Sequence, residues 1–235
     1  MKKSFLFIIL FTIINISAFS QAVFGVSAGA GASFSSSYSN FKFSNLFPAD
    51  EKDVLNTKSA GGGVNAFFDL TYVEFFLGTT FGNLKNYKGE SFNTFSLHLG
   101  LLAKYPIEIT YDFLLFPMFG IDYEAVLSRR DKNGENLTYP IGNNASYESE
   151  GSEESEESQF NEVPAKKALN ALWMKFGLGM DIYIAEYIFL RPEFLYGFRF
   201  KNTYEKFMVK SLGAYLTSIF NHGFDIKFTV GFLLY

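Results

Sequence analysis

The 235-residue sequence contains no cysteine. That absence excludes disulfide frameworks, thiolate metal sites and a lipid-modified N-terminal cysteine. The net charge is −4, and no basic stripe suits nucleic acid. Apart from the first residues, no apolar run approaches the roughly 20 residues that a membrane-spanning helix needs. The sequence therefore predicts neither a nucleic-acid-binding protein nor a helical membrane protein.

Aromatic residues and glycine are abundant, with 30 Phe, 14 Tyr and 20 Gly. This composition is typical of a β-barrel whose outer face touches acyl chains and whose interior is narrow. The length suits one domain.

Residues 1–20 have the pattern of a secretory signal peptide. Lys2 and Lys3 precede an apolar run, and Ala18-Phe19-Ser20 forms a small-x-small cleavage site. We expect cleavage before Gln21, which leaves residues 21–235 as the barrel domain. The alternative is an uncleaved N-terminal anchor, for which the apolar run is short.

The last thirteen residues, 223–235, alternate with a strict period of two, as a β-strand does. Bulky residues occupy one face, and the other face carries glycines and an opposed charge pair. A small, charged face suits a crowded interior, so we expect the bulky face to meet lipid. The bulky residues are Phe224, Ile226, Phe228, Val230, Phe232 and Leu234.

Seven earlier stretches repeat this alternation, at 24–34, 63–72, 75–81, 94–101, 113–124, 172–182 and 188–199. Long polar connections are expected at 35–60, 83–91, 127–167 and 201–222, and short turns at 72–74, 104–106 and 183–186. Residues 147–162 contain seven acidic residues and no basic one, so the 127–167 loop should be partly disordered. The spacing of Leu212, Tyr215, Leu216 and Ile219 predicts one or two helical turns.

Two further features concern the predicted wall. Pro117 and Pro192 lie inside strands, where each removes a backbone donor and suggests a bulge or local break. Tyrosines near the short turns suit a membrane interface. They are Tyr72, Tyr105, Tyr183 and Tyr187.

The signal peptide, the alternating long and short connections and the aromatic closing strand are the features of a known family. On these features the chain resembles the eight-stranded bacterial outer-membrane barrels typified by the OmpA barrel domain, OmpX and OmpW. The resemblance implies an all-β, antiparallel, up-and-down transmembrane barrel with long extracellular loops and short periplasmic turns. It also implies a C-terminal assembly signal, here Phe228, Val230, Phe232 and Tyr235, with Tyr235 out of phase with the lipid-facing residues.

Inward positions carry charges of both signs. An eight-stranded interior is barely wide enough for side chains, so these charges predict an ion-pair network that plugs the lumen, the space inside the barrel. We expect Arg191 to pair with an acid such as Glu193 or Asp122. A narrow polar conduit is the alternative. The candidate network comprises Asp69, Glu74, His98, Asp122, Glu124, Lys175, Asp181, Arg191, Glu193, Arg199, Asp225 and Lys227.

His98 and Ser96 share the inward face, which raises the idea of a hydrolase. A nucleophile and base need a third orienting group, and the sequence identifies none. We therefore predict that the protein is not an enzyme and has no cofactor. Calcium-loop spacing is absent, so we also predict no metal site.

The predicted function is a plugged outer-membrane barrel that presents surface loops for structural, adhesive or interaction roles. A narrow channel or carrier and a lipid-modifying enzyme are the alternatives. A soluble lipocalin-type barrel would expose a glycine-rich surface prone to association. The expected partners are outer-membrane lipid and, during biogenesis, the barrel-assembly machinery and periplasmic chaperones. We expect a monomer, and the sequence identifies no extracellular ligand.

Overall fold

The computed structural model describes residues 25–43, 56–87, 89–135, 138–141, 161–164, 170–200 and 216–234. Their regular elements are all β-strands, paired antiparallel. No helix in these ranges is long and apolar enough to cross a membrane. The predicted signal peptide, its cleavage site and residues 147–160 of the acidic centre of the long insert lie outside the described residues.

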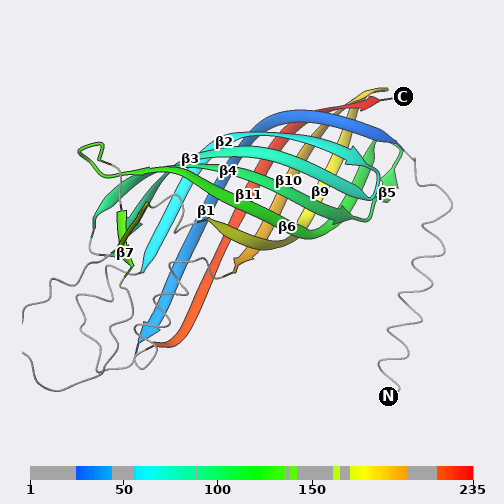
Figure 1. Cartoon of the computed structure of the whole chain (residues 1–235). Coiled ribbons are helices and arrows are strands. Elements are labelled where there is room, and N and C mark those ends of the chain that lie inside the picture. The colour runs from blue at the N-terminus through cyan, green and yellow to red at the C-terminus, as the bar shows by residue number, and fades with distance from the viewer. Residues whose placement is uncertain are drawn as a thin grey trace, which may run out of the picture.

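Eight long strands form the wall in Figure 1. Neighbouring wall strands pair in the order β4-β3-β2-β1-β11-β10-β9-β6, so the first strand, β1, pairs with the last, β11. The β4–β6 pairing, from Asn93↔Arg130 to Lys104↔Met118, closes the ring. The predicted eight-stranded antiparallel barrel is therefore confirmed. The wall strands are β1 (Val26–Phe43), β2 (Thr57–Leu70), β3 (Val73–Asn86), β4 (Ser91–Lys104), β6 (Phe113–Arg130), β9 (Ala171–Ala185), β10 (Ile188–Arg199) and β11 (Leu216–Leu234).

Three short strands complete the set. β5 (Ile107–Thr110) pairs with β6 beyond the point where β4 stops. β7 (Thr138–Ile141) and β8 (Asn161–Pro164) pair with each other in a separate two-stranded sheet. In Figure 1 the C-terminal end of β11 lies with β5 at one end of the barrel, and β7 lies toward the other.

The two-residue turns all lie at the β5 end, which we call the turn end. Residues 71–72 join β2 to β3, 111–112 join β5 to β6, and 186–187 join β9 to β10. The turn predicted at 104–106 is wrong, because the chain continues into β5 past Pro106 and reverses six residues later. The turn predicted at 183–186 is also displaced, since β9 runs to Ala185.

Thr71 in the first of these turns has a φ of 54°, in the left-handed region. This conformation is unusual for a β-branched residue. Its hydroxyl bonds both the N–H and the C=O of Gly25, each at 2.9 Å. These bonds tie the turn to the start of β1 and help to hold the strained residue.

At the opposite end, the loop end, the strands extend further than predicted. β1 continues to Phe43, β3 to Asn86 and β6 to Arg130, so part of each predicted loop belongs to the wall. The second connection is only residues 87–90. The predicted helical turns are wrong where the structure describes them, because Leu216 and Ile219 belong to β11. Leu212 and Tyr215 lie outside the described residues.

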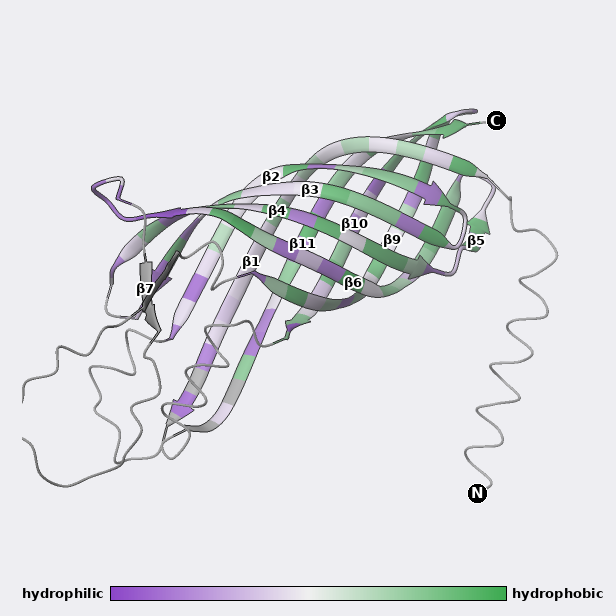
Figure 2. Cartoon of the chain, viewed as in Figure 1, coloured by the Kyte–Doolittle hydropathy of each residue, from purple (hydrophilic) through white to green (hydrophobic). Residues whose placement is uncertain are grey.

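The two faces of the wall differ as the period of two requires. Outward side chains such as Val64, Leu99 and Phe228 are 60–64% exposed, whereas inward Arg191 and Asp122 are at most 1% exposed. Figure 2 shows the resulting alternation of hydropathy along the strands. The strands also become more hydrophilic toward the loop end of β1 and β2. An outer apolar face and a polar interior are thus built by one repeating pattern.

Pro192 interrupts one ladder, as the sequence suggested. The β9–β10 pairing lacks partners between Leu190↔Ile182 and Glu193↔Gly179 but resumes in the same register, so the break is not a bulge. Pro117 lies on β6, opposite the gap between the end of β4 and the start of β5. Its carbonyl accepts a hydrogen bond from the Tyr105 N–H at 3.2 Å. Both prolines therefore occupy places where a backbone donor is not needed.

Buried phenylalanines fill the lumen opposite glycines. In each case the two residues are direct cross-strand partners, and the ring covers the glycine. A Cβ added at Gly231 would lie 2.2 Å from the Phe189 ring, and one at Gly100 would lie 2.1 Å from Phe76. Small residues are thus required where the rings lie. The pairs are Gly29–Phe67, Gly100–Phe76, Gly179–Phe116 and Gly231–Phe189.

This packing predicts the effect of one added methyl group. We expect Gly231→Ala to lower the free energy of unfolding by about 1–3 kcal/mol, because the methyl would overpack the ring of Phe189. Gly62→Ala is the matched control, since its added Cβ meets only the Ser33 carbonyl oxygen, at 3.7 Å. Urea unfolding of both variants in the same micelles measures the difference. Equal stability of the two variants would contradict the packing role.

Candidate functional site

The site lies inside the barrel, where charged side chains from all parts of the chain meet. Its sequence-predicted residues occupy inward positions on six strands, β2, β3, β4, β6, β9 and β10, together with the closing strand β11. From the turn end to the loop end they form successive layers, because positions two residues apart along each strand share the inward face. Each layer has its own partners.

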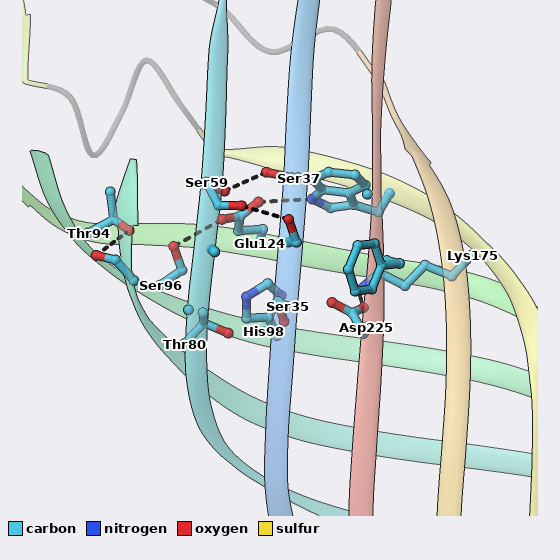
Figure 3. A pocket seen from close by; sticks show the side chains of 17 residues that line it. Ser35, Ser37, Ser59, Thr80, Thr94, Ser96, His98, Glu124, Lys175 and Asp225 are labelled. Carbon is cyan, nitrogen blue, oxygen red and sulfur yellow. Dashed lines mark hydrogen bonds and ion pairs between the residues drawn. The ribbon is translucent and has the colours of Figure 1, made fainter. Parts of the chain in front are cut away.

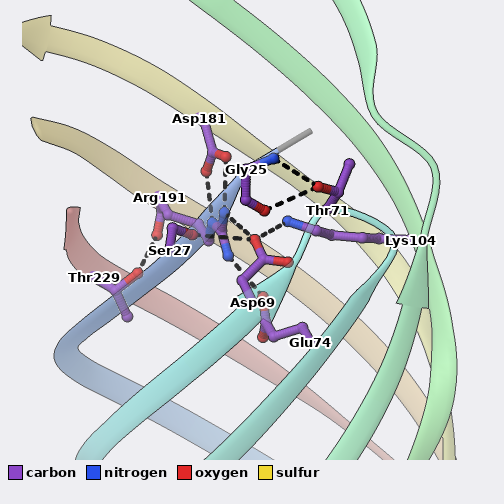
Figure 4. A network of polar contacts seen from close by, with 9 residues as sticks. All are labelled: Gly25, Ser27, Asp69, Thr71, Glu74, Lys104, Asp181, Arg191 and Thr229. Carbon is purple, nitrogen blue, oxygen red and sulfur yellow. Dashed lines mark hydrogen bonds and ion pairs between the residues drawn. The ribbon is translucent and has the colours of Figure 1, made fainter. Parts of the chain in front are cut away.

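The layer nearest the turn end is the Arg191 cluster, defined as Arg191, Asp69, Glu74, Asp181 and Lys104 (Figure 4). The guanidinium donates to Asp181 at 2.5 and 2.8 Å, to Glu74 at 2.8 Å and to Asp69 at 2.8 Å. Lys104 also donates to Asp69. Three carboxylates thus converge on one side chain, which is 1% exposed.

Aromatic rings enclose the same guanidinium. Its central carbon lies 4.3 Å from the centroid of the Phe67 ring, 4.9 Å from Phe189 and 5.1 Å from Phe116. Cations over ring faces are attracted by the ring quadrupole, more strongly where water is absent. Since Arg191, Phe116 and Phe189 are essentially inaccessible, the Arg191 cluster and its rings fill the lumen at this level.

The acidic partners proposed for Arg191 from the sequence were wrong. Glu193 instead pairs with Lys227 at 3.2 Å. Asp122 pairs with Lys175 at 2.5 Å. Lys227 also lies over the Phe76 ring, with its Nζ 3.8 Å from the centroid. Arg191, Lys175 and Lys227 therefore each contact both a carboxylate and an aromatic ring.

A second group, the Lys175 cluster, lies nearer the loop end and consists of Lys175, Asp122, Asp225 and His98. Lys175 bridges Asp122 and Asp225, which lie on different strands. The Nδ1 of His98 lies 3.0 Å from Asp122 Oδ2. The cluster crosses the interior from β4 to β11, so it forms a second polar layer above the Arg191 cluster.

Above the Lys175 cluster the interior opens into a small polar cavity, seen in Figure 3. About 50 Å³ is accessible to the centre of a water molecule, which is enough for ordered water. Glu124 orders one side by accepting from Ser96 at 3.0 Å and from the Trp173 indole at 2.9 Å. A smaller cavity of about 20 Å³ lies against Lys175 and Lys227. The larger cavity is also lined by Ser35, Ser37, Ser59, Thr80 and Thr94.

Ser96 and His98 have separate partners. The Ser96 hydroxyl donates to Glu124, and the histidine ring contacts Asp122. The described residues therefore contain no Ser96–His98 hydrogen bond of the kind that activates a nucleophile. They also contain no group of three or more His, Asp or Glu side chains that could hold a metal ion.

Several lumen residues were missed from the sequence. Lys104 was assigned to a turn, although it pairs with Asp69 inside the barrel. Trp173 lies inward, 6% exposed, between Lys175 and Arg199, whose charges lie 5.9 and 5.8 Å from its ring centroid. The sequence could have revealed these residues, because each lies an even number of positions from an inward charge on the same strand. The missed aromatic residues are Phe67, Phe76, Phe116, Trp173 and Phe189.

The remaining site residues lie as follows. Arg199 donates to the Ser39 hydroxyl at 2.8 Å near the loop end. Phe228, Val230 and Phe232 of the proposed assembly signal point outward and are 41–64% exposed. Tyr235 lies outside the described residues, so the complete signal stays a prediction.

The tyrosines near the turns differ from expectation. Tyr183 packs inward against Phe189, with 5.5 Å between ring centroids, and the Tyr105 hydroxyl is buried. Interface anchoring is therefore wrong for these two residues. Tyr187 is 47% exposed, and the unforeseen Tyr111 is 90% exposed at the β5–β6 turn.

Known proteins resemble this chain in structure but not in sequence. No protein-family model matches the sequence, and no curated protein does. Among solved structures, the chain is similar to Neisserial surface protein A, with 10% identity, 89% of this chain and 99% of that chain covered, and a TM-score of 0.43. It is also similar to the outer membrane protein OprG from Pseudomonas aeruginosa, with 10% identity, coverage of 92% and 98%, and a TM-score of 0.41.

A third similar structure is Ail, the attachment invasion locus protein of Yersinia pestis. Here the identity is 8%, the coverage is 90% of this chain and 100% of that chain, and the TM-score is 0.36. At such identities the likeness concerns the barrel alone. The assignment of the fold rests on the closed strand pairing, and the site is interpreted from its own contacts.

The Arg191 cluster predicts a large loss of stability when its cation is removed. Arg191→Met leaves three buried carboxylates without their shared partner, so we expect a loss of about 3–5 kcal/mol in the free energy of unfolding. Lys132→Met, at an exposed turn residue, is the matched control and should change it little. Adding Asp181→Asn to Arg191→Met should cost less than the sum of the single changes. Additive losses in a denaturant titration would refute the coupling.

Proposed function

We propose that this chain is an integral bacterial outer-membrane protein whose barrel is closed within and presents its loop end to the outside. The observation that carries the proposal is the pair of opposed faces of the wall. Soluble monomers rarely expose contiguous apolar patches above a few hundred Å². Here apolar side chains face outward along every wall strand, and the charges of the membrane-spanning part face inward.

The dimensions also suit a membrane. Transmembrane strands need roughly 9–11 residues, and the outer apolar band of such barrels is about 25 Å tall. The wall strands have 12–19 residues, so each spans the band, and the longest, β11, β1 and β6, extend well beyond it. In β1 and β11 the extra length lies at the loop end, where their pairing continues past the start of β2, and this favours a wall that projects above the membrane.

The orientation follows from the connections. In bacterial barrels of this type the short turns face the periplasm and the longer loops face outward. The tight turns at 71–72, 111–112 and 186–187 are therefore assigned to the periplasm. The acidic segment 147–162 is assigned to the cell surface.

A tag beside Gly151 should be labelled on intact cells, and labelling only after permeabilisation would invert this topology.

The closed interior favours a surface-presenting role over transport. The Arg191 cluster and its phenylalanine rings fill the lumen near the turn end, where Arg191, Phe116 and Phe189 are at most 1% exposed. The two small cavities favour a narrow conduit as the second candidate, since they lie in line above the plug. The proposed activity is therefore presentation of the loop end, and the identity of what it contacts is a separate question.

Electrical recording separates the two candidates. We expect purified protein in planar bilayers to show no steady single-channel conductance, because the Arg191 cluster blocks the lumen. Arg191→Ala combined with Phe116→Ala should introduce conductance by removing the cation and one enclosing ring. Leu99→Ala, on the outer face, is the control and should stay silent. Steady conductance of the wild type would favour the conduit.

The membrane assignment has its own test. Phe228 is 64% exposed on the outer face, so Phe228→Lys should cost on the order of 2–4 kcal/mol of folding free energy in lipid. Phe228→Leu should be tolerated as the control. Refolding with and without micelles, followed by circular dichroism, provides the measurement. Folding of the wild type in plain buffer would reject the outer-membrane proposal.

A further inference from the structure

The outer wall carries a set of cations at its loop end. Lys58 and Lys85 are direct cross-strand partners on β2 and β3, and Arg130 pairs with Asn93 at the end of β6. All three cations are exposed. Asn83 on β3 pairs with Ala60 on β2 and with Asn93 on β4, and Asn93 in turn pairs with Arg130, so one row of residues joins the four strands. We call Lys58, Lys85 and Arg130 the basic rim.

The basic rim has no counter-charge on the wall. Among the described residues no ion pair involves any of its three members, and the outward positions of β2, β3, β4 and β6 include no Asp or Glu. Two acids of the described connections, Glu90 and Asp131, lie beyond the strand ends. Glu90 accepts from the Asn86 side chain at 2.7 Å, and Asp131 accepts from the backbone N–H of Glu135 at 2.9 Å. Within the described wall, the rim is therefore a positive patch without an acidic partner.

An aromatic shelf lies directly below the rim, toward the middle of the wall. Phe81 and Phe95 are cross-strand partners whose rings stack at 4.4 Å with an interplanar angle of 14°. Two residues along a strand span about 7 Å, so the shelf lies one row below Arg130 and two rows below Lys85. Between shelf and rim is an open groove of about 500 Å³, lined by Ala60, Phe81, Gly82, Asn83, Asn93, Thr94, Phe95, Ser128 and Arg130.

Below the shelf the wall becomes aliphatic. Leu77 and Leu99 are cross-strand partners, 52% and 60% exposed, and Val64 beside them is 62% exposed. A ligand seated in the groove would therefore meet cations at its upper end, flat rings at its centre and an apolar surface below. This order of surfaces matches an amphiphile with an anionic head and a hydrocarbon chain.

We propose that the basic rim and its groove bind a lipid with a phosphorylated head group, which lies in the leaflet around the loop end. The phosphate accepts from Lys58, Lys85 and Arg130, with Asn93 available as a neutral donor. The first part of the acyl chain lies on Phe81 and Phe95 and continues over Leu77 and Leu99. The inference rests on the proposed membrane location, because it places this rim at the level of the head groups.

A free phosphorylated solute is a weaker match to the same surface. Phosphate alone would use the cations but leave the shelf and the aliphatic wall uncovered. Clusters of Lys and Arg beside a membrane attract anionic lipids, and each contributes roughly fivefold in affinity. The continuity of cations, rings and aliphatic wall in one column of the barrel therefore favours a lipid.

Native mass spectrometry of the full chain in neutral detergent tests the proposal. The probes are phosphatidic acid and phosphatidylcholine with identical chains. We expect wild type to bind phosphatidic acid at least tenfold more tightly. Combined Lys58→Gln, Lys85→Gln and Arg130→Gln should abolish the preference, and each single change should reduce it several-fold. Lys132→Gln, which removes a neighbouring charge from the turn, should keep the preference within about twofold.

The outcomes separate this inference from the membrane proposal. Equal binding of both lipids, or a preference that survives in the combined variant, would overturn the lipid site while leaving the barrel in its membrane. Displacement of phosphatidic acid by an equal concentration of glycerol 3-phosphate would overturn the role of the acyl chain. Wild type that folds in plain buffer and retains neither lipid would instead overturn the membrane proposal. Since all four substituted residues are exposed, the single variants should fold.

Discussion

A guanidinium that is almost fully removed from solvent is the constraint on which the rest of the interior depends. Arg191 is 1% exposed, and removing such a charge from water is costly unless it is paired and hydrogen-bonded. The barrel meets this requirement with carboxylates from β2, β3 and β9 and with rings from β2, β6 and β10. The wall must therefore close in one register, because a shift would separate the cation from its partners.

The glycines of the lumen require the same strand register as the charges do. Four buried phenylalanines each require a glycine as the direct cross-strand partner, and a slip of one residue would turn every side chain to the opposite face. Charges and rings thus specify one arrangement together. This arrangement explains how an eight-stranded wall without disulfides holds a closed interior.

The outer face follows a different physical rule. Its apolar side chains contact only neighbours on the same face, as Phe81 contacts Phe95, so position along the barrel axis matters more than identity. Charges are absent from its described middle, and the basic rim occurs only near the loop end. The proposed membrane and the proposed lipid are two consequences of this axial order. One depends on the apolar band, and the other depends on where that band gives way to cations.

How much could be predicted from the sequence depended on the range of the interaction. The period of two revealed the wall, because each strand carries its own alternation, and the inward parity of Arg191 and Asp69 was readable for the same reason. The pairing was not readable. Arg191 meets Asp69 across 122 positions and Glu74 across 117, and neighbours in the lumen depend on strand tilt and register. Glu193 and Asp122 were predicted as its partners only because both are acids at inward positions.

Turn positions failed for a related reason. Pro106 looked like the end of a strand, yet β5 continues past it because β6 still offers partners at Leu114 and Leu115. Lys104 was consequently assigned to a turn and its bond to Asp69 was missed. The sequence by itself determined the strands, their two faces and the kind of residue on each, because these depend on local period and composition. Only the tertiary structure decided which charges meet, where the lumen closes and which cations gather outside, because those contacts join residues that only the closed ring brings together.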